Sequence, residues 1–153
     1  MSASKPQTYC TFYLDNYYFG IEVEQVQEII RFQEITPVAL APHVVKGLIN
    51  LRGQIVTAVD LRSLLELPDR QSDEVPMNIV VRTPLGAFSL LADRIGDVLE
   101  LSDDSFEAPP DNLNGMAREL IQRAYKLDGV LLLTMAIEKV VSADVLNRRQ
   151  VAA

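Results

Sequence analysis

The sequence has very little of the two side chains on which many metal sites and hydrolases depend. Its 153 residues include one cysteine, Cys10, one histidine, His43, and no tryptophan. One cysteine cannot form a disulfide within the chain, and the two residues together are too few for a Cys/His zinc site. A Ser-His-Asp triad would depend on His43, which the pattern places on an exposed turn. Cys10 alternates with Phe12 and Leu14, which favours a buried structural position over a reactive thiol.

Basic charge is also scarce. The chain carries 14 Lys and Arg against 21 Asp and Glu, a formal net charge of −7, and its longest basic run is the pair Arg148-Arg149. Nucleic acids and anionic membranes need a basic stripe, so neither is expected as the main partner. No stretch approaches the ~18 apolar residues of a membrane span, and residues 1–10 lack the apolar segment of a signal peptide. We therefore expect a cytoplasmic protein.

Catalytic motifs are missing as well. The sequence contains no phosphate-binding G-x-x-x-x-G-K-[ST] or G-x-G-x-x-G, no H-E-x-x-H and no G-x-S-x-G. Asp60 and Asp93 each end an apolar run, where a capping or turn role is favoured over acid-base chemistry. These absences favour an interaction module that is not an enzyme and uses no cofactor or metal. The alternative from a different class is a small β-barrel that binds a small ligand or serves as a subunit of an enzyme complex.

What the sequence does contain is a strong strand signal. Apolar residues alternate with a period of two along 8–14 and again along 17–23, with Asp15-Asn16 between them, which predicts a hairpin. Residues 24–32 fit a helix face or an irregular strand, and their β-branched content favours a bulged strand. Residues 47–62 predict a second hairpin that turns at Arg52-Gly53.

Short helices are expected at three places. Residues 42–47 begin with proline and end with glycine, which predicts one helical turn. Asp60 is a candidate N-cap for a helix that Pro68 ends, and 68–76 is the best candidate for a linker. Ser142 is a candidate cap for a C-terminal amphipathic helix that would dock Val145 and Leu146.

The chain also repeats itself. Residues 19–30 match 88–99 at an offset of 69, and residues 51–65 match 127–141 at an offset of 76. Two repeats of short strands predict an all-β protein with a few short helices, built by duplication as two small barrels. The approximate boundaries are 15–75 for the first barrel and 76–153 for the second, with the N-terminal strand 8–14 a candidate to join the second. Apolar residues from both halves should form one continuous core.

The repeat separates two residues of the turn at Arg52-Gly53. Gly53 aligns with Gly129, but Arg52 aligns with Asp128. The fold therefore requires only Leu-x-Gly here, with the glycine supplying a positive φ or a close approach. The charge of Arg52 is then a candidate for function.

Several stretches together resemble one known family. These are YFGIEVEQVQEII, ITPVALAPHVVKGLINLRGQIVTAVDLRSLL, LLADRIGDVLEL, FEAPP and LDGVLLLTMAIEKVV, which span about residues 9–141. They are similar, in order, to the CheW family of bacterial chemotaxis coupling proteins. The resemblance implies two SH3-like five-stranded β-barrels around a shared apolar core, in a single CheW-like domain over 1–153. It also implies a non-catalytic adaptor, without cofactor, that links the cytoplasmic helical hairpins of chemoreceptors to the histidine kinase CheA.

The resemblance also implies site residues. The positions that match the receptor-binding groove are Val23, Val26, Glu28, Arg52 and Gly53. From spacing alone, Val26 fits a core position equally well and Glu28 fits a solvated strand face.

Contact with the kinase, or with further CheW-like subunits in a ring, is implied less firmly. The matching positions are Ile55, Glu107, Asp111 and Asn112. Some relatives have a basic residue and an aromatic residue in place of Glu107 and Asn112, which puts ring closure through these contacts in doubt. A chemosensory array that serves surface motility or a second messenger remains an alternative to flagellar chemotaxis, and recruitment to membrane-associated arrays is expected in either case.

Overall fold

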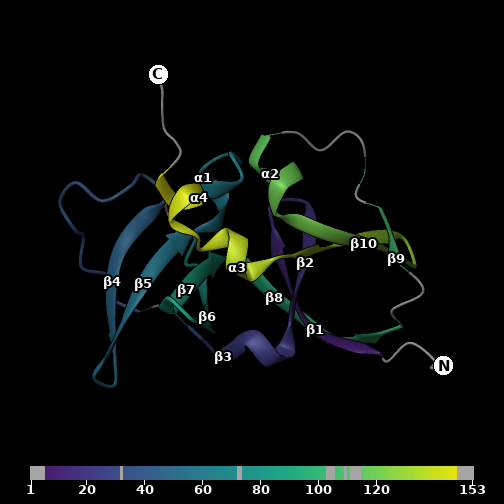
Figure 1. The fold of residues 1–153 in the computed structure, drawn as a ribbon, viewed down its shortest axis with the longest axis horizontal. Coiled ribbons are helices and arrows are strands. Elements are labelled where there is room, and N and C mark those ends of the chain that lie inside the picture. Colours follow the sequence, from purple (N-terminus) through teal and green to yellow (C-terminus); the bar gives the residue numbers. More distant parts are fainter. Residues whose placement is uncertain are drawn as a thin grey trace.

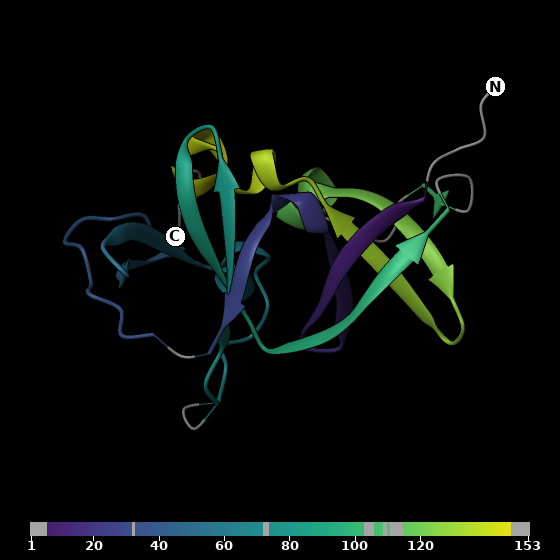
Figure 2. The same ribbon diagram turned by 90° about the horizontal axis from the view of Figure 1, so that it is seen from below.

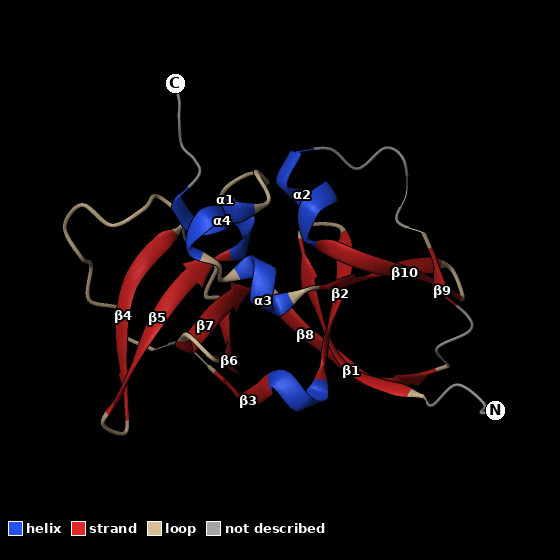
Figure 3. Cartoon of the chain, in the orientation of Figure 1, coloured by secondary structure: helices blue, strands red, loops and turns tan. Residues whose placement is uncertain are grey.

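The computed structural model describes residues 6–31, 33–71, 74–102, 106–108, 110 and 115–147. Most of these residues lie in strands, and the helices are short (Figure 3). The strands are β1 (Gln7–Leu14), β2 (Tyr17–Glu22), β3 (Val26–Ile30), β4 (Val45–Leu51), β5 (Gln54–Asp60), β6 (Met77–Thr83), β7 (Gly86–Ala92), β8 (Arg94–Leu101), β9 (Phe106–Glu107), β10 (Ile121–Leu127) and β11 (Val130–Met135). The helices are η1 (Val23–Gln25, 3-10), α1 (Leu61–Leu64), α2 (Gly115–Leu120), α3 (Ile137–Val140) and α4 (Ala143–Asn147).

The strands form two small barrels that lie side by side (Figure 1). The first barrel has the strand order β3-β6-β7-β5-β4, and the second has β8-β1-β2-β11-β10, to which β9 adds a two-residue sixth strand. In Figure 1, α1, α2 and α4 lie on the upper side of the molecule, and η1 and β3 lie on its lower side. This confirms the predicted all-β class with a few short helices.

Strand register shows that the two barrels arose by duplication. In the second barrel Phe19 of β2 pairs in parallel with Leu133 of β11. Adding 69 to Phe19 gives Phe88, and subtracting 76 from Leu133 gives Thr57. Phe88 and Thr57 are partners in the parallel pairing of β7 with β5. The two offsets found in the sequence therefore reproduce the pairing of one barrel from the other.

The two barrels also share an irregularity in strand pairing, a register shift at equivalent positions. The ladder of β10 with β11 shifts register between Ile121 and Arg123, and that of β4 with β5 shifts between Val45 and Gly47. Each of these positions is displaced from its counterpart by 76 residues. A bulge conserved between two halves of one chain indicates common descent of the repeats.

The barrel boundaries differ from the predicted ones. As expected, β1 lies in the second barrel, but β2 lies there too, and β6 and β7 lie in the first barrel. The division into 15–75 and 76–153 is therefore wrong for these three strands. The physical reason is that β1 and β2 form one tight antiparallel hairpin, as do β6 and β7. The two strands of a hairpin pair with each other, so both belong to the same barrel. Each half of the chain thus places its first hairpin in the barrel of the other half.

A single apolar cluster fills the space between the barrels, as predicted. From the second barrel it includes Phe12, Leu14, Phe19, Ile21, Leu133 and Met135, and from the first barrel Val59, Ile79, Val81, Leu90 and Ala92. Because strand side chains alternate, Val80 points the other way from Ile79 and Val81, into a separate small cluster inside the first barrel. Cys10 is buried as expected, and burial raises the pKa of its thiol.

The interiors of the barrels are filled by side chains. Inside the second barrel the Tyr9 and Tyr125 hydroxyls lie 3.2 Å apart, and the Tyr18 hydroxyl donates to Oγ1 of Thr11 at 3.0 Å. Burial and the hydrogen bond with Tyr125 raise the pKa of Tyr9. The first barrel holds aliphatic side chains around Ser89, whose hydroxyl donates to Oδ1 of Asn78 at 2.7 Å. Packed interiors of this kind are typical of small barrels that hold no ligand.

Two of the predicted helices are confirmed. Asp60 caps α1 by accepting a hydrogen bond from the Arg62 backbone N–H at 3.1 Å. Ser142 accepts from the Val145 N–H at 3.2 Å at the start of α4, and Val145 and Leu146 are buried. Among the described residues, no helix is long and apolar enough to cross a membrane.

The helical turn predicted over 42–47 is wrong. Only a turn forms, in which the Val45 N–H donates to the Pro42 carbonyl at 2.9 Å, and β4 begins at Val45. Gly47 lies inside β4 with φ +147°, and a Cβ there would collide with the carbonyl of Thr36. The glycine therefore permits a close backbone approach and does not end a helix. His43 is exposed, as expected.

Candidate functional site

The residues predicted to bind a receptor meet on one side of the first barrel. Val23 is in η1, Val26 and Glu28 are on β3, and Arg52-Gly53 form the turn between β4 and β5. β3 and β4 are the two edges of the sheet, and the tip of the β4–β5 hairpin reaches back to β3. Figure 2 shows η1 and β3 in front, between the two barrels.

Arg52 and Glu28 form an ion pair between the guanidinium Nη2 and the carboxylate Oε2. The Arg52 side chain is 67% exposed and that of Glu28 is 24% exposed. An exposed pair of this kind contributes about 0–1 kcal/mol to stability. Most of the guanidinium is therefore open to solvent, where it has donors for a further partner.

The turn that presents Arg52 has a demanding backbone. Arg52 has φ +52° and Gly53 has φ +88°, the pattern of a type I′ hairpin turn. The Gly53 N–H donates to Oδ1 of Asn50 at 2.9 Å, which fixes the turn from within. A side chain at such a φ costs about 1–2 kcal/mol for any residue but glycine, asparagine or aspartate. Glycine, asparagine or aspartate would therefore be energetically more favourable than arginine at this position.

A second side-chain contact joins β3 to the same end of the β4–β5 hairpin. Nε2 of Gln27 donates to Oε1 of Gln54 at 3.2 Å, next to the Arg52–Glu28 pair. We call these four residues, Gln27, Glu28, Arg52 and Gln54, the clasp of the first barrel. The equivalent residues of the second barrel, by the two offsets, are Gly96, Asp97, Asp128 and Val130. This set cannot form the ion pair, so the clasp distinguishes the two barrels.

Val23 and Val26 add an apolar strip beside the clasp. Both side chains are half-buried, and Val26 packs against the edge of the central cluster, opposite Val81 of β6. Val26 therefore takes part in both the core and the surface. An apolar strip flanked by a charged pair is suited to the side of an amphipathic helix, which supplies apolar ridges and polar flanks.

Of the residues predicted to contact a kinase or ring partner, the two that the structure describes lie on different barrels. Ile55 is 58% exposed on β5 of the first barrel. Glu107 lies on β9 of the second barrel and pairs with Nζ of Lys126 at 3.7 Å. Asp111 and Asn112 lie outside the described residues.

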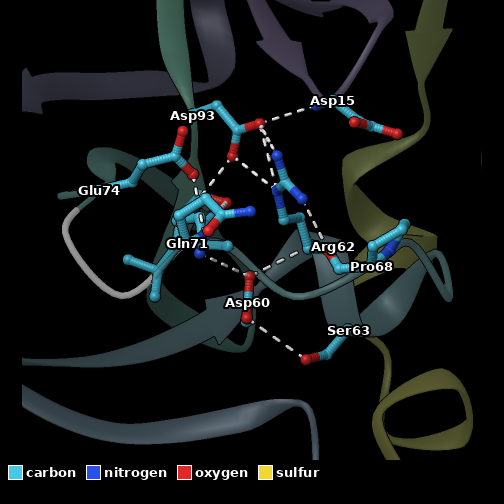
Figure 4. A network of polar contacts seen from close by, with 10 residues as sticks. Asp15, Asp60, Arg62, Ser63, Pro68, Gln71, Glu74 and Asp93 are labelled. Atoms are coloured by element: carbon cyan, nitrogen blue, oxygen red, sulfur yellow. Dashed lines mark hydrogen bonds and ion pairs between the residues drawn. The ribbon is translucent and has the colours of Figure 1, made fainter.

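Sequence reasoning missed a buried charge network at the other side of the molecule (Figure 4). Asp93 accepts from Arg62 Nε at 2.9 Å and Nη2 at 2.6 Å, from Arg70 Nε at 3.0 Å, and from the Asp15 backbone N–H at 2.7 Å. Burial alone would raise the pKa of Asp93, but the Arg62 hydrogen bonds, the Asp15 N–H and the two positive charges hold it below the usual value. The signal available in the sequence was Arg62 itself, a charged residue among leucines two positions after Asp60.

A separate groove of about 620 Å³ lies between β2, β11 and the end of α1. Its lining is mixed, with apolar side chains such as Phe19, Leu67 and Leu131 beside the polar Asn16 and Glu66. Among the described residues, no cluster of three or more His, Cys, Asp or Glu could hold a metal ion.

The fold and the site define a class, which is a duplicated two-barrel β module whose charged clasp and apolar strip are suited to binding a helix. Within that class, the chain belongs to the CheW family, because the CheW-like domain matches residues 8–145. A chemotaxis protein CheW of Klebsiella aerogenes is 30% identical over 138 residues, which cover 90% of this chain and 83% of that protein. A chemotaxis protein CheW of Thermotoga maritima is 29% identical, over 86% of this chain and 85% of that protein. The crystal structure of the scaffolding protein TtCheW from Thermoanaerobacter tengcongensis matches with a TM-score of 0.77 at 23% identity, over 86% of this chain and 89% of that one.

These findings confirm the family and the role of a chemotaxis adaptor. The family model matches most of this chain, and the two relatives match it over most of their own length as well. The structural match shows that the fold is the same as in a protein described as a scaffold.

Proposed function

We propose that the chain links the cytoplasmic tips of chemoreceptors to the histidine kinase CheA, as a cytoplasmic adaptor without catalytic activity or cofactor. The observation that carries this proposal is the clasp, where exposed Arg52 and its partner Glu28 lie beside the apolar strip of Val23 and Val26. Membership of the CheW family supports the same assignment.

The receptor tip is a helical hairpin in this family, and the geometry suits such a partner. The apolar strip would take a ridge of the receptor helix, and burial there would supply most of the binding energy. Arg52 would donate to carboxylates or C-terminal carbonyls of the helix and so fix its register. Glu28 would hold the guanidinium in place through the ion pair, and Gly53 would keep the turn close to the partner backbone.

For the kinase, we propose that Ile55 contributes to the contact from the first barrel. More than half of its surface is exposed on a strand whose next residue, Val56, is fully buried. Glu107, which lies on β9 of the second barrel, is proposed as a ring contact together with Asp111 and Asn112, which lie outside the described residues. Ile55 and Glu107 lie on different barrels, so one subunit could bridge two neighbours.

The test is a pull-down with a receptor cytoplasmic fragment and CheA, each alone and then together. Arg52→Glu should leave the fold intact and weaken receptor binding about tenfold or more, because it reverses the charge and repels Glu28. Lys139→Glu is the matched control: it makes the same charge change at an exposed residue of α3. Equal receptor binding by wild type and Arg52→Glu would rule out the clasp as the receptor site.

A further inference from the structure

The chain passes between the barrels twice within its described strands. It leaves β2 of the second barrel through η1 and enters β3 of the first, and it leaves β7 of the first barrel and enters β8 of the second at Asp93. The offset of 69 relates the two crossovers and aligns Asp93 with Glu24. The clasp and apolar strip lie at the first crossover. The buried charge network lies at the second.

Asp93 is bound to both barrels at once. Its backbone N–H donates to the Tyr13 carbonyl at 3.0 Å, and its carboxylate accepts from the Asp15 N–H, both on the β1–β2 hairpin of the second barrel. From the side of the first barrel, Arg62 at the start of α1 grips the same carboxylate through Nε and Nη2. Figure 4 shows the carboxylate between the Asp15 turn and the guanidinium.

The rest of the network fixes the arginines. Nη1 of Arg62 donates to the Pro68 carbonyl at 2.6 Å, so all three nitrogens of the guanidinium have a partner. Arg70 donates to Asp60 at 3.3 Å and to the Leu91 carbonyl at 3.3 Å, in addition to Asp93. The side chains of Arg62, Arg70 and Asp93 are 10%, 12% and 16% exposed. Each charge is therefore held by several oriented partners in a largely desolvated place.

Such a network determines geometry in a way that the central apolar cluster does not. Apolar burial is non-directional, so a smooth seam would tolerate small rotations of one barrel against the other. A bidentate arginine–carboxylate pair fixes both distance and orientation. The equivalent residues at the first crossover, Glu24 and Glu138, are both exposed acids, so the first crossover has no counterpart of this pair.

We propose that Arg62 and Asp93 are positioning residues that lock the angle between the two barrels and thereby shape the receptor-binding groove at the opposite crossover. The part that concerns the groove rests on the proposed function. The part that concerns the angle stands without it, and the two are measured separately.

The test measures the distance between spin labels in the two barrels by double electron–electron resonance. Cys10 is the single cysteine of the chain, so Cys10→Ala gives a background for labels at Leu85→Cys in the first barrel and Val98→Cys in the second, where the native residues are 67% and 61% exposed. Arg62→Lys keeps the positive charge but cannot form the bidentate pair of hydrogen bonds with the Asp93 carboxylate. It should broaden or shift the distance distribution, whereas Arg52→Lys, the same substitution in the exposed clasp, should leave it unchanged.

Receptor affinity is measured on the same variants without labels. Arg62→Lys should weaken binding about threefold to thirtyfold, the range expected when a coupled but non-contacting residue is changed. If Arg62→Lys does not fold, Arg70→Met, which leaves the Arg62–Asp93 pair, should show the same changes in smaller measure.

Two outcomes would overturn the proposal. One is an unchanged distance distribution in folded variants of both Arg62 and Arg70. The other is a changed distribution with wild-type receptor affinity, provided that Arg52→Glu does lose binding. If Arg52→Glu also binds normally, the proposed receptor site fails, while the distance measurement still decides whether the network locks the angle.

Discussion

At the scale of single residues, Arg52 shows how a sequence oddity can be separated from the needs of the fold. Both turn residues have positive φ, but only glycine is indifferent to that conformation. The equivalent turn of the second barrel has Asp128 at this position, so the barrel fold does not require arginine. The receptor-binding role proposed for the guanidinium would explain why arginine occupies a position whose backbone conformation disfavours it.

This leads to a prediction for Arg52→Asn. Asn-Gly is the most favourable pair for a type I′ turn, so relief of backbone strain should offset the loss of the surface ion pair. We expect the free energy of unfolding to stay within about 1 kcal/mol of wild type, or to rise, while receptor binding falls. Urea denaturation and calorimetric titration measure the two effects. A loss of more than about 2 kcal/mol would show that the clasp is a structural element first.

Residue patterns in the sequence located the Asp15-Asn16 turn and the caps of α1 and α4, but not the long-range polar partners. Asp15-Asn16, Asp60 and Ser142 act within a few residues of themselves, so local rules locate them. The Arg52–Glu28 pair spans 24 residues and the Arg62–Asp93 pair spans 31. Such contacts depend on how strands are ordered in space, and no local rule provides that order.

At the scale of elements, β4 shows why a glycine can be misinterpreted. Gly47 follows Pro42 at the spacing of a helix stop, yet it lies in a strand where Thr36 crosses close to its Cα. The Thr36 and Leu48 backbones exchange two hydrogen bonds of 2.8 Å, which hold the crossing segment against the edge of the barrel. The pattern of 24–32, by contrast, was interpreted correctly as a bulged strand over 26–30, where β3 shifts register between Val26 and Glu28. Glu24 and Gln25 lie in η1 instead, and residue 32 lies outside the described residues.

Two glycine substitutions test this account of β4. Gly47→Ala should lower the free energy of unfolding by about 2–4 kcal/mol, since it adds a collision with the Thr36 carbonyl to the cost of positive φ. Gly53→Ala also has positive φ but meets no atom within 4 Å, so it should cost only about 1 kcal/mol. Denaturant unfolding of the two variants measures the difference. Equal costs would mean that the close approach at Gly47 has no energetic weight.

At the scale of the whole molecule, the shared cluster should make the two barrels unfold as one unit. All five tyrosines lie in β1, β2 and β10 of the second barrel, and the chain has no tryptophan. Tyrosine fluorescence therefore reports on the second barrel alone. Leu90 is fully buried in the central cluster but belongs to β7 of the first barrel.

We predict that Leu90→Ala destabilises the protein by about 2–5 kcal/mol through the cavity it leaves. The transition followed by tyrosine fluorescence should shift by the same amount as that followed by far-ultraviolet circular dichroism. A fluorescence midpoint that stays at the wild-type value would mean that the second barrel unfolds independently.

The charge network should make the stability of the whole protein depend on pH in the acid range. The pKa of Asp93 is lower in the folded protein than in the unfolded chain, so its contribution to stability is complete above about pH 4, where the unfolded carboxyl ionises. That contribution is lost as the pH falls through the lower folded pKa. We expect the midpoint of urea unfolding to drop as the pH falls below about 4.

Asp93→Asn provides the control for this prediction. The variant should be less stable near neutral pH, because Arg62 loses its bidentate partner, but its stability should depend less on pH in the acid range. Identical acid dependence in the variant and the wild type would assign the effect to other carboxylates.

The exchange of hairpins between the two halves has a consequence for the origin of this architecture. A single ancestral repeat would have contained two strands that belong in one barrel and three that belong in another. Such a chain could complete its barrels only with a second copy, as a symmetric dimer whose subunits traded hairpins. Fusion of two copies would then have made the dimer permanent and freed each half to diverge, so that one crossover could acquire the clasp and the other the buried arginine network.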